Sequence, residues 1–281
     1  FRSQARATRE DSHMTISPWL TSLARRSRRA LSAATSSPDP RPSYTTSAVS
    51  SATVDKDGSV KLHTSSEKLI YRPKAGSSQF SVGRLVFTET MRLGHEEQMR
   101  ESTRKELLKY ESPELRKMIA PILKGWASAK ANLDVLELGP AYTTAIPEAL
   151  SENLHSYHAV DFSQPYLQKQ QEILQENPAL AALCHMTVSD IYDLTKAKAS
   201  CDLIFASCHP PLVSSSIEDK CAVLDKIHAL LRNGGTFALF PWYFSEQPQA
   251  VNRHLLQLFQ VKQIAYQKDW RARLFLILEK R

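Results

Sequence analysis

The chain has 281 residues, of which 42% are hydrophobic and 8% aromatic, so it is long and apolar enough to bury one substantial core. Its net charge of +7 is uneven, because residues 1–53 contain eight Arg and three acidic residues while the remainder carries only +2. The basic character therefore belongs to the N-terminal segment and does not indicate a nucleic-acid groove on the folded part.

Cysteine spacing and apolar runs indicate whether a protein binds metal through cysteine, depends on disulfides or spans a membrane. The four cysteines form no C-x-x-C pair and no metal spacing, so we expect reduced thiols, a reducing compartment and no metal site. No apolar run approaches the roughly 18 residues that a membrane-spanning helix needs. We therefore expect a soluble protein without a membrane partner.

Residues 1–53 are predicted to be a low-complexity basic tail. Residues 1–14 end with the first Met, in a tripeptide that resembles a cloning remnant, so they do not enter the fold prediction. From Met14 to Thr53 the chain is rich in Ser and Thr and cannot bury enough apolar surface to fold alone. Its Arg-rich, acid-poor, amphipathic start resembles a mitochondrial presequence. The alternatives are a disordered basic linker and an arm that binds RNA or a large protein complex. We expect a mitochondrial protein, with a cytoplasmic location as the alternative.

Two short segments are predicted between the tail and the main domain. Residues 54–84 contain the turn sequence DKDG between β-prone runs, which indicates a small hairpin or an extended arm. Residues 85–130 are predicted to be a helical cap with one helix over 88–110 and a second that begins at Ser112. Pro121 is expected to kink the second helix.

Residues 131–281 alternate strands with helices, which predicts a doubly wound, mostly parallel sheet covered on both faces. The expected strands are 134–138, 156–160, 184–188, 202–206, 236–240, 261–267 and 273–278. The expected helices are 145–152, 165–174, 217–231 and 247–259. Only five residues separate the last two strands, so we expect a hairpin that ends in an antiparallel edge strand.

The motifs at the strand ends resemble those of a known family. Glu137-Leu-Gly139 is similar to the acid and first glycine of an E-x-G-x-G-x-G motif, and Asp161 and Asp190 lie at the ends of the next two strands. With the terminal hairpin, they resemble the class I S-adenosylmethionine-dependent methyltransferases, a Rossmann-like family, over roughly residues 85–281. The resemblance implies a seven-stranded α/β sheet with a C-terminal antiparallel hairpin, a helical cap, and S-adenosylmethionine as cofactor. A nicotinamide-binding Rossmann domain is less similar, because G-x-G-x-x-G is absent.

The resemblance also implies roles for residues just after the strands, where doubly wound sheets bind their ligands. Asp161 would accept hydrogen bonds from the ribose hydroxyls, with capping of the next helix as the alternative. Asp190 would lie near the adenine amino group, and Glu137 is either a cofactor ligand or a buried acid. The candidate cofactor-binding residues are Glu137, Gly139, Pro140, Ala141, Asp161, Phe162, Ser163, Asp190, Ile191 and Ser207.

The loop after the first of these strands departs from the family motif. Ala141 and Thr143 stand where the family has its second and third glycines, which allow close approach to a ligand or positive φ. Together with Tyr142, these residues would either close the cofactor site or reshape it.

His209 is the candidate catalytic residue, as a general base for an oxygen or nitrogen nucleophile. The alternative is a structural histidine that caps a strand end. His209 precedes Pro-Pro-Leu212, where nitrogen-methylating nucleic-acid enzymes often carry D/N/S-P-P-Y, and this departure argues against adenine or cytosine as the methyl acceptor. Trp242 and Tyr243 would either stack on a flat substrate or cover the core.

Two functions therefore stay open. The first is an S-adenosylmethionine-dependent methyltransferase of unknown acceptor, which the acids at the strand ends favour. The second is a catalytically inactive methyltransferase-like subunit with a structural or assembly role in a mitochondrial ribonucleoprotein, such as a ribosome precursor. The glycine-poor loop and the basic tail favour this second function.

Overall fold

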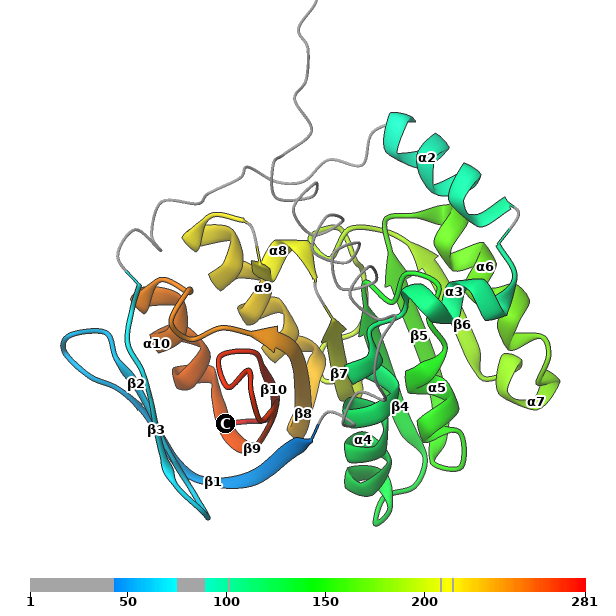
Figure 1. The fold of residues 1–281 in the computed structure, drawn as a ribbon. Helices are drawn as coiled ribbons and strands as arrows, with labels where there is room; N and C mark the ends of the chain where they lie inside the picture. The colour runs from blue at the N-terminus through cyan, green and yellow to red at the C-terminus, as the bar shows by residue number, and fades with distance from the viewer. Residues whose placement is uncertain (1–42, 75–88, 101, 208, 214) are drawn as a thin grey trace, which may run out of the picture. The chain divides into compact units, whose positions relative to one another are not determined.

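The computed structural model describes residues 43–74, 89–100, 102–207, 209–213 and 215–281. Contacts divide the chain into two units, Phe1–Pro42 and Ser43–Arg281, and every described element belongs to the second (Figure 1). The predicted tail lies outside the described residues up to position 42, and so do residues 75–84 of the predicted arm.

The described strands pair into one ten-stranded sheet in the order β3-β2-β1-β9-β10-β8-β7-β4-β5-β6 (Figure 1). The strands β6, β5, β4, β7 and β8 run parallel, and every pairing from β8 to β3 is antiparallel. Their bounds are β1 (Tyr44–Val54), β2 (Val60–Thr64), β3 (Lys68–Tyr71), β4 (Leu133–Leu138), β5 (Leu154–Asp161), β6 (Cys184–Val188), β7 (Cys201–Ser207), β8 (Leu231–Trp242), β9 (Phe259–Gln267) and β10 (Leu274–Lys280).

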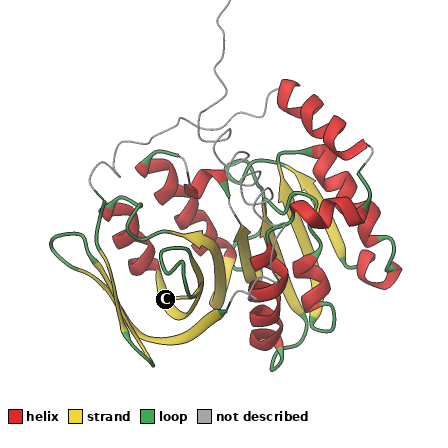
Figure 2. Ribbon diagram, viewed as in Figure 1, coloured by secondary structure: helices red, strands yellow, loops and turns green. Residues whose placement is uncertain are grey.

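Helices lie on both faces of the parallel strands (Figure 2). They are α2 (Glu89–Arg100), α3 (Arg104–Tyr110), the π-helical turn η2 (Leu115–Ile119), α4 (Ala120–Ala127), α5 (Ala145–Leu150), α6 (Gln164–Leu174), α7 (Pro178–Ala181), α8 (Pro210–Val213), α9 (Ile217–Leu230) and α10 (Gln249–Leu258). None of these described helices is long and apolar enough to cross a membrane.

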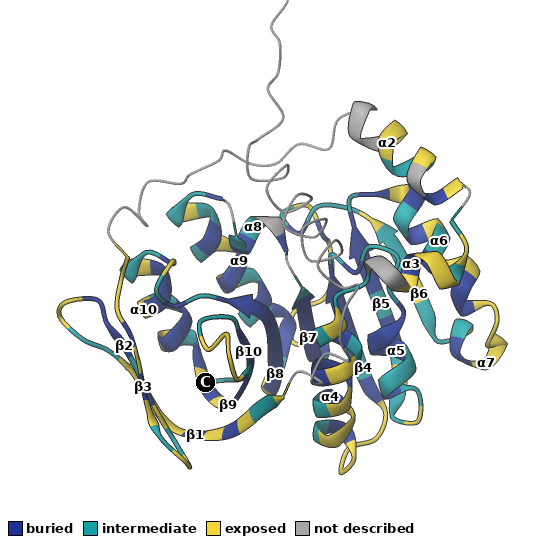
Figure 3. Ribbon diagram, in the orientation of Figure 1, coloured by how far each residue is buried: buried dark blue, intermediate teal, exposed yellow. Residues whose placement is uncertain are grey.

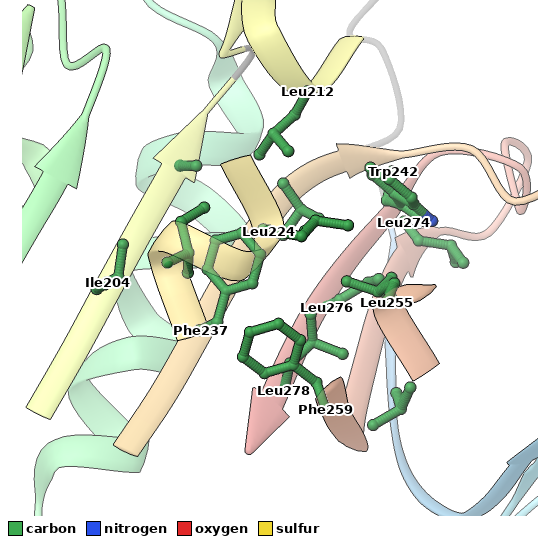
Figure 4. Close-up of a cluster of buried hydrophobic side chains, with 14 of the residues drawn as sticks. Ile204, Leu212, Leu224, Phe237, Trp242, Leu255, Phe259, Leu274, Leu276 and Leu278 are labelled. Carbon is green, nitrogen blue, oxygen red and sulfur yellow. The ribbon is translucent and has the colours of Figure 1, made fainter. Parts of the chain in front are cut away.

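Each face of the sheet carries its own apolar core. Val135 of β4 belongs to the core formed with α4, α5 and α6, whereas Leu136 belongs to the core formed with α9 and α10. Figure 4 shows the second core, in which Leu224 of α9 lies close to Phe237 of β8, and Leu255 of α10 lies close to Leu276 of β10. Burial on both faces explains the continuous apolar runs of the central strands, which Figure 3 shows as almost entirely buried.

The predicted α/β architecture is confirmed, but the sheet has ten strands instead of the expected seven. The strands expected after residue 130 are found within about two residues, except that β8 begins at Leu231. The three additional strands, β1 to β3, form an antiparallel meander that pairs with β9.

β1 also corrects the predicted end of the tail, since residues 44–53 form a strand. Only Ser47 and Val49 of β1 are fully buried, so the strand has little apolar pattern of its own. It is held by backbone pairing with β9 on one side and β2 on the other. The β-prone runs within 54–84 form the hairpin of β2 and β3, but the DKDG turn lies before it and connects β1 to β2.

The predicted terminal hairpin is present, but the expectation of an edge strand was wrong. β10 lies between β8 and β9, and β9 is in turn covered by β1. The run Leu274–Leu278 is almost completely buried, and such an apolar strand is stable only in the interior of a sheet.

The predicted cap helices are interrupted in two places. The expected helix over 88–110 is divided into α2 and α3, because Thr103 starts a new helix by forming a capping box with Glu106. In the following helix, Ala120 donates its N–H to Leu115 five residues earlier, which makes the π-helical turn. This wider turn directly precedes Pro121, which has no N–H to donate.

Candidate active site

The parallel strands place the carboxyl ends of β5, β4 and β7 side by side. Gly139 directly follows β4, has a φ of +71° and donates its N–H to the Val160 carbonyl at 2.8 Å. A Cβ at position 139 would lie 3.4 Å from Nδ1 of His209, which follows β7. Glycine is therefore favoured both by the backbone conformation and by the closeness of the imidazole.

Asp161, at the end of β5, connects the loop after β4 to the start of α6. Its Oδ2 accepts the N–H of Ala141 at 3.0 Å, and its Oδ1 accepts the N–H of Ser163 at 2.8 Å. The side chain is buried, which raises the pKa of its carboxyl group to about 6. A carboxylate oxygen can accept two hydrogen bonds, so both oxygens retain capacity for a ligand hydroxyl.

Glu137 lies completely buried on β4, close below the same loop. Its Oε2 accepts a hydrogen bond from the Tyr157 hydroxyl at 2.6 Å, and Gln170 of α6 donates both to that hydroxyl and to the carbonyl of Thr143. Burial raises the pKa of Glu137 to about 8, and the negative charges of Glu111 and Asp161 act in the same direction. In this structure Glu137 is part of a buried polar network that supports the loop.

Tyr142 and Thr143 connect the glycine-poor loop to the cap. The Tyr142 hydroxyl donates to the carbonyl of Leu107 in α3 at 3.5 Å, and its ring meets that of Tyr166 edge-on at 5.8 Å. The Thr143 hydroxyl donates to Glu111, which directly follows α3. Thr143, which stands at a glycine position of the family motif, thus makes a contact that glycine cannot make, and Tyr142 beside it contacts the cap as well.

An ionic network extends these contacts to α5. Arg116 donates to Glu111 and, at 2.8 Å, to Glu148 of α5. Glu148 also accepts from Arg104 of α3 at 2.7 Å and from Thr144 at 2.6 Å. The cap and the loop are therefore held by the same carboxylates.

The helix α2 contacts the opposite side of the site through His95. Its Nδ1 lies 2.8 Å from the Ser163 hydroxyl, and its ring stacks on Tyr166 at 4.1 Å. Burial lowers the pKa of His95. Sequence reasoning missed His95, Tyr166 and Glu111, because their roles depend on how the cap docks and no local motif marks them.

The turn after β6 begins beside the end of β5, where the Ser189 N–H donates to the Asp161 carbonyl at 3.0 Å. Asp190 accepts the N–H of Tyr192 at 3.0 Å and so shapes this turn, while Ile191 is buried in the core. Of the remaining predicted residues, Pro140 is buried, and Phe162 and Ser207 are half-buried.

A family model described as "Methyltransferase domain" matches residues 129–271, about half of the chain. This chain belongs to that methyltransferase family. The predicted resemblance to the class I methyltransferases is thereby confirmed at the level of the family and the fold. A comparison of the sequence with curated proteins gives no match.

Solved structures with the same fold include the N-methyltransferase NodS of Bradyrhizobium japonicum WM9 in complex with S-adenosyl-l-homocysteine. It is 12% identical, with a TM-score of 0.52, and the match covers 67% of this chain and 97% of NodS. A second NodS structure, also 12% identical, matches with a TM-score of 0.49 over 60% of this chain and 98% of its own. A SAM dependent methyltransferase from Aquifex aeolicus is 11% identical, with a TM-score of 0.47. The match covers 64% of this chain and 100% of the Aquifex chain.

His209 lies on the β7 side of this methyltransferase domain. Its side chain is only 8% exposed, and neither ring nitrogen has a hydrogen-bond partner in the described part of the chain. Burial lowers its pKa to about 4, so the imidazole is neutral near pH 7. Its backbone carbonyl accepts the N–H groups of Leu212 and Val213, which fixes the residue at the start of α8.

Trp242, one of the two candidate stacking residues of the methyltransferase domain, is part of the core. It is 1% exposed and packs edge-on against Phe244, which lies 5.7 Å from the ring of Tyr71 at the end of β3. The N-terminal meander therefore covers these aromatic rings. Tyr243 is half-buried.

Proposed function

We propose that the chain is an S-adenosylmethionine-dependent methyltransferase whose cofactor lies over Gly139 and Asp161. The chain leaves β4 towards β5 and β6 on one side and returns through β7 and β8 on the other. Ligands of such sheets bind at the carboxyl ends of the strands where the order reverses. The observation that carries the proposal is the hydrogen bond from Ala141 to Asp161, because it fixes an acid beside the glycine loop at this point.

The residues present fit such a ligand. Gly139 keeps side-chain atoms away from the backbone at the end of β4, and the Asp161 carboxylate at the end of β5 retains acceptor capacity for a ligand hydroxyl. The ring nitrogens of His209 lie buried and unpaired beside Gly139, among the described residues, where a second ligand next to the cofactor would pair with them. When bound, S-adenosylmethionine supplies an electrophilic methyl group. The complex of NodS with S-adenosyl-l-homocysteine supports this choice of cofactor.

Within this proposal, each residue has a distinct role. Asp161 accepts hydrogen bonds from the ribose hydroxyls with the lone pairs that Ala141 and Ser163 leave free. Gly139 allows close approach of the ligand to the backbone, and Asp190 lies at the adenine end. The helices α2 and α3 cover the site and exclude water from it.

Isothermal titration of the purified protein with S-adenosylmethionine and S-adenosylhomocysteine tests the proposal. We expect micromolar dissociation constants, and Asp161→Ala should weaken binding at least tenfold, about 1.4 kcal/mol. Asp225→Ala, which changes an exposed acid on α9, is the control and should bind as the wild type does. If Asp161→Ala binds with unchanged affinity, the ribose-binding role is wrong.

The absence of any binding by a folded protein would favour the second function, an inactive structural or assembly subunit of a mitochondrial ribonucleoprotein. The observation that favours this second function is that the side chains of Tyr142 and Thr143 form hydrogen bonds with the cap. In that case the basic N-terminal segment would be the part to test for RNA or protein partners.

A further inference from the structure

The unpaired nitrogens of His209 distinguish this residue from the other partly buried histidines. His95 is paired with Ser163, and Nε2 of His158 lies 2.7 Å from the Thr187 hydroxyl. His209 is more deeply buried than either, yet both of its ring nitrogens lack a partner in the described chain. Since a neutral imidazole has one donor and one acceptor nitrogen, folding alone does not explain a polar side chain at this position.

No charged group of the described residues acts on the pKa of His209, which burial alone lowers. The acids on the neighbouring strands β4 and β5 have other partners, since Asp161 binds two backbone N–H groups and Glu137 binds Tyr157. A carboxylate or phosphate beside this imidazole would be desolvated without a counter-ion, which is strongly unfavourable.

We propose that His209 holds the methyl acceptor, and that this acceptor is an uncharged hydroxyl compound. This assignment deepens the proposed function and rests on it. The acceptor oxygen forms a bond to the methyl carbon as the carbon–sulfur bond breaks with its electron pair on sulfur. The hydroxyl proton passes to a ring nitrogen of His209 and from there to water.

Oxygen suits this site better than nitrogen because of the acidity of the group that is methylated. A hydroxyl oxygen becomes strongly acidic while it is being methylated, so a weakly basic imidazole is a sufficient proton acceptor. An ammonium product holds its proton too firmly for such a base.

Thermal melting first tests whether the His209 side chain binds a ligand or instead stabilises the fold. His209→Leu removes two unpaired polar atoms and should leave the midpoint unchanged or raise it by about 2 °C. His158→Leu, which breaks a hydrogen bond to Thr187, is the matched control and should lower the midpoint. A clearly lower midpoint for His209→Leu would mean that the imidazole stabilises the fold, which would overturn the assignment.

The acceptor class is tested by nitrogen NMR of ¹⁵N-histidine-labelled protein saturated with S-adenosylhomocysteine. The His209 resonances are identified by their loss in His209→Leu. Titration with phenol and cyclohexanol at millimolar concentration should shift them, while benzoate, cyclohexanecarboxylate and aniline should not. A shift caused by the carboxylates or by aniline, or no shift with either hydroxyl compound, would overturn the proposal. Failure of the proposed function is recognised separately, because the wild-type protein would then not bind S-adenosylhomocysteine in calorimetry.

Discussion

The hydroxyl of Thr143 donates a hydrogen bond to the carboxylate of Glu111. Thr143 belongs to the loop after β4, and Glu111 directly follows the cap helix α3. Thr143 stands where the family has glycine, and its side chain connects the loop to the cap. We therefore expect the loop and the cap to move together.

Thr143→Ala should loosen α3. The hydrogen bond to a charged acceptor contributes about 1 to 2 kcal/mol, so amide hydrogens of residues 104–110 should exchange several-fold faster. Thr64→Ala removes a threonine hydroxyl bond in the turn between β2 and β3 and is the control. Hydrogen exchange measured by mass spectrometry on both variants tests the coupling. Equal exchange of α3 in Thr143→Ala and wild type would contradict it.

Glu137 should make stability depend on pH. Its pKa is about 8 in the folded protein against 4.5 in the unfolded chain, so between these values the folded state binds one more proton. The free energy of unfolding should therefore fall as pH rises through this window. Asp161 acts in the same direction only up to about pH 6, and His209 in the opposite direction only below 6.5.

Glu137 is thus the main contributor to this pH dependence from pH 6.5 to 8, because Lys220, with a pKa of about 8, acts in the opposite direction only near the upper end. Chemical denaturation should show a loss of up to about 2 kcal/mol across this range in the wild type and little loss in Glu137→Gln, whose side chain is always neutral. Glu152→Gln, at an exposed site, is the control and should retain the wild-type slope. A slope that persists in Glu137→Gln would show that another group is responsible.

Exchange of alanine and glycine should change the stability of the protein differently at positions 141 and 139. Both have positive φ, +53° and +71°. Ala141→Gly relieves a left-handed conformation that is unfavourable for alanine by about 1 kcal/mol, which offsets the greater freedom of glycine in the unfolded chain. Gly139→Ala adds strain and places a Cβ against His209, so it should lower stability by about 1 to 2 kcal/mol.

Denaturant unfolding of both variants measures this difference. Ala222→Gly, on the exposed side of α9, is the control and should lower stability by about 1 kcal/mol. If Ala141→Gly destabilises the protein as much as Ala222→Gly does, the left-handed conformation carries no strain.

The sequence predicted those elements whose signals are local. The central strands β4 and β7 are short apolar runs buried on both faces, and helices such as α6 show a clear apolar stripe, so their positions were predicted closely. β1 could not be recognised, because a strand rich in Ser and Thr is stabilised here by pairing with residues more than 200 positions away. The place of β10 inside the sheet is likewise a long-range property.

The residues of the candidate site likewise include some that a local motif identifies and others whose contacts depend on the tertiary structure. Gly139 and Asp161 follow strands and were identified from the motif, and the structure places both at the loop. The contacts of Tyr142 and Thr143 with the cap depend on the docking of α3, which no periodicity in the sequence reveals. The complete burial of Glu137 follows from the position of Tyr157 and Gln170 below the loop, which is again a tertiary feature.

Lys220 is a buried cation that the proposed activity does not use. It lies in the first turn of α9 with 4% of its surface exposed, and its Nζ donates to Oε1 of Gln247 at 2.9 Å. The ion pairs of the described residues include none with Lys220, and burial lowers its pKa to about 8. Burying a cation without a counter-ion is unfavourable, so Lys220→Met should be as stable as the wild type or more stable.

The pH dependence provides the decisive measurement for Lys220. Its pKa of about 8 in the folded state is below the unfolded value of 10.5, so between these values the unfolded chain binds more protons. Wild-type stability should then rise as pH increases from 8 towards 10, and this rise should be smaller in Lys220→Met. Lys124→Met, at an exposed position on α4, is the control and should keep the wild-type profile. A loss of several kcal/mol in Lys220→Met at pH 7 would mean that the ammonium group has a partner that stabilises it.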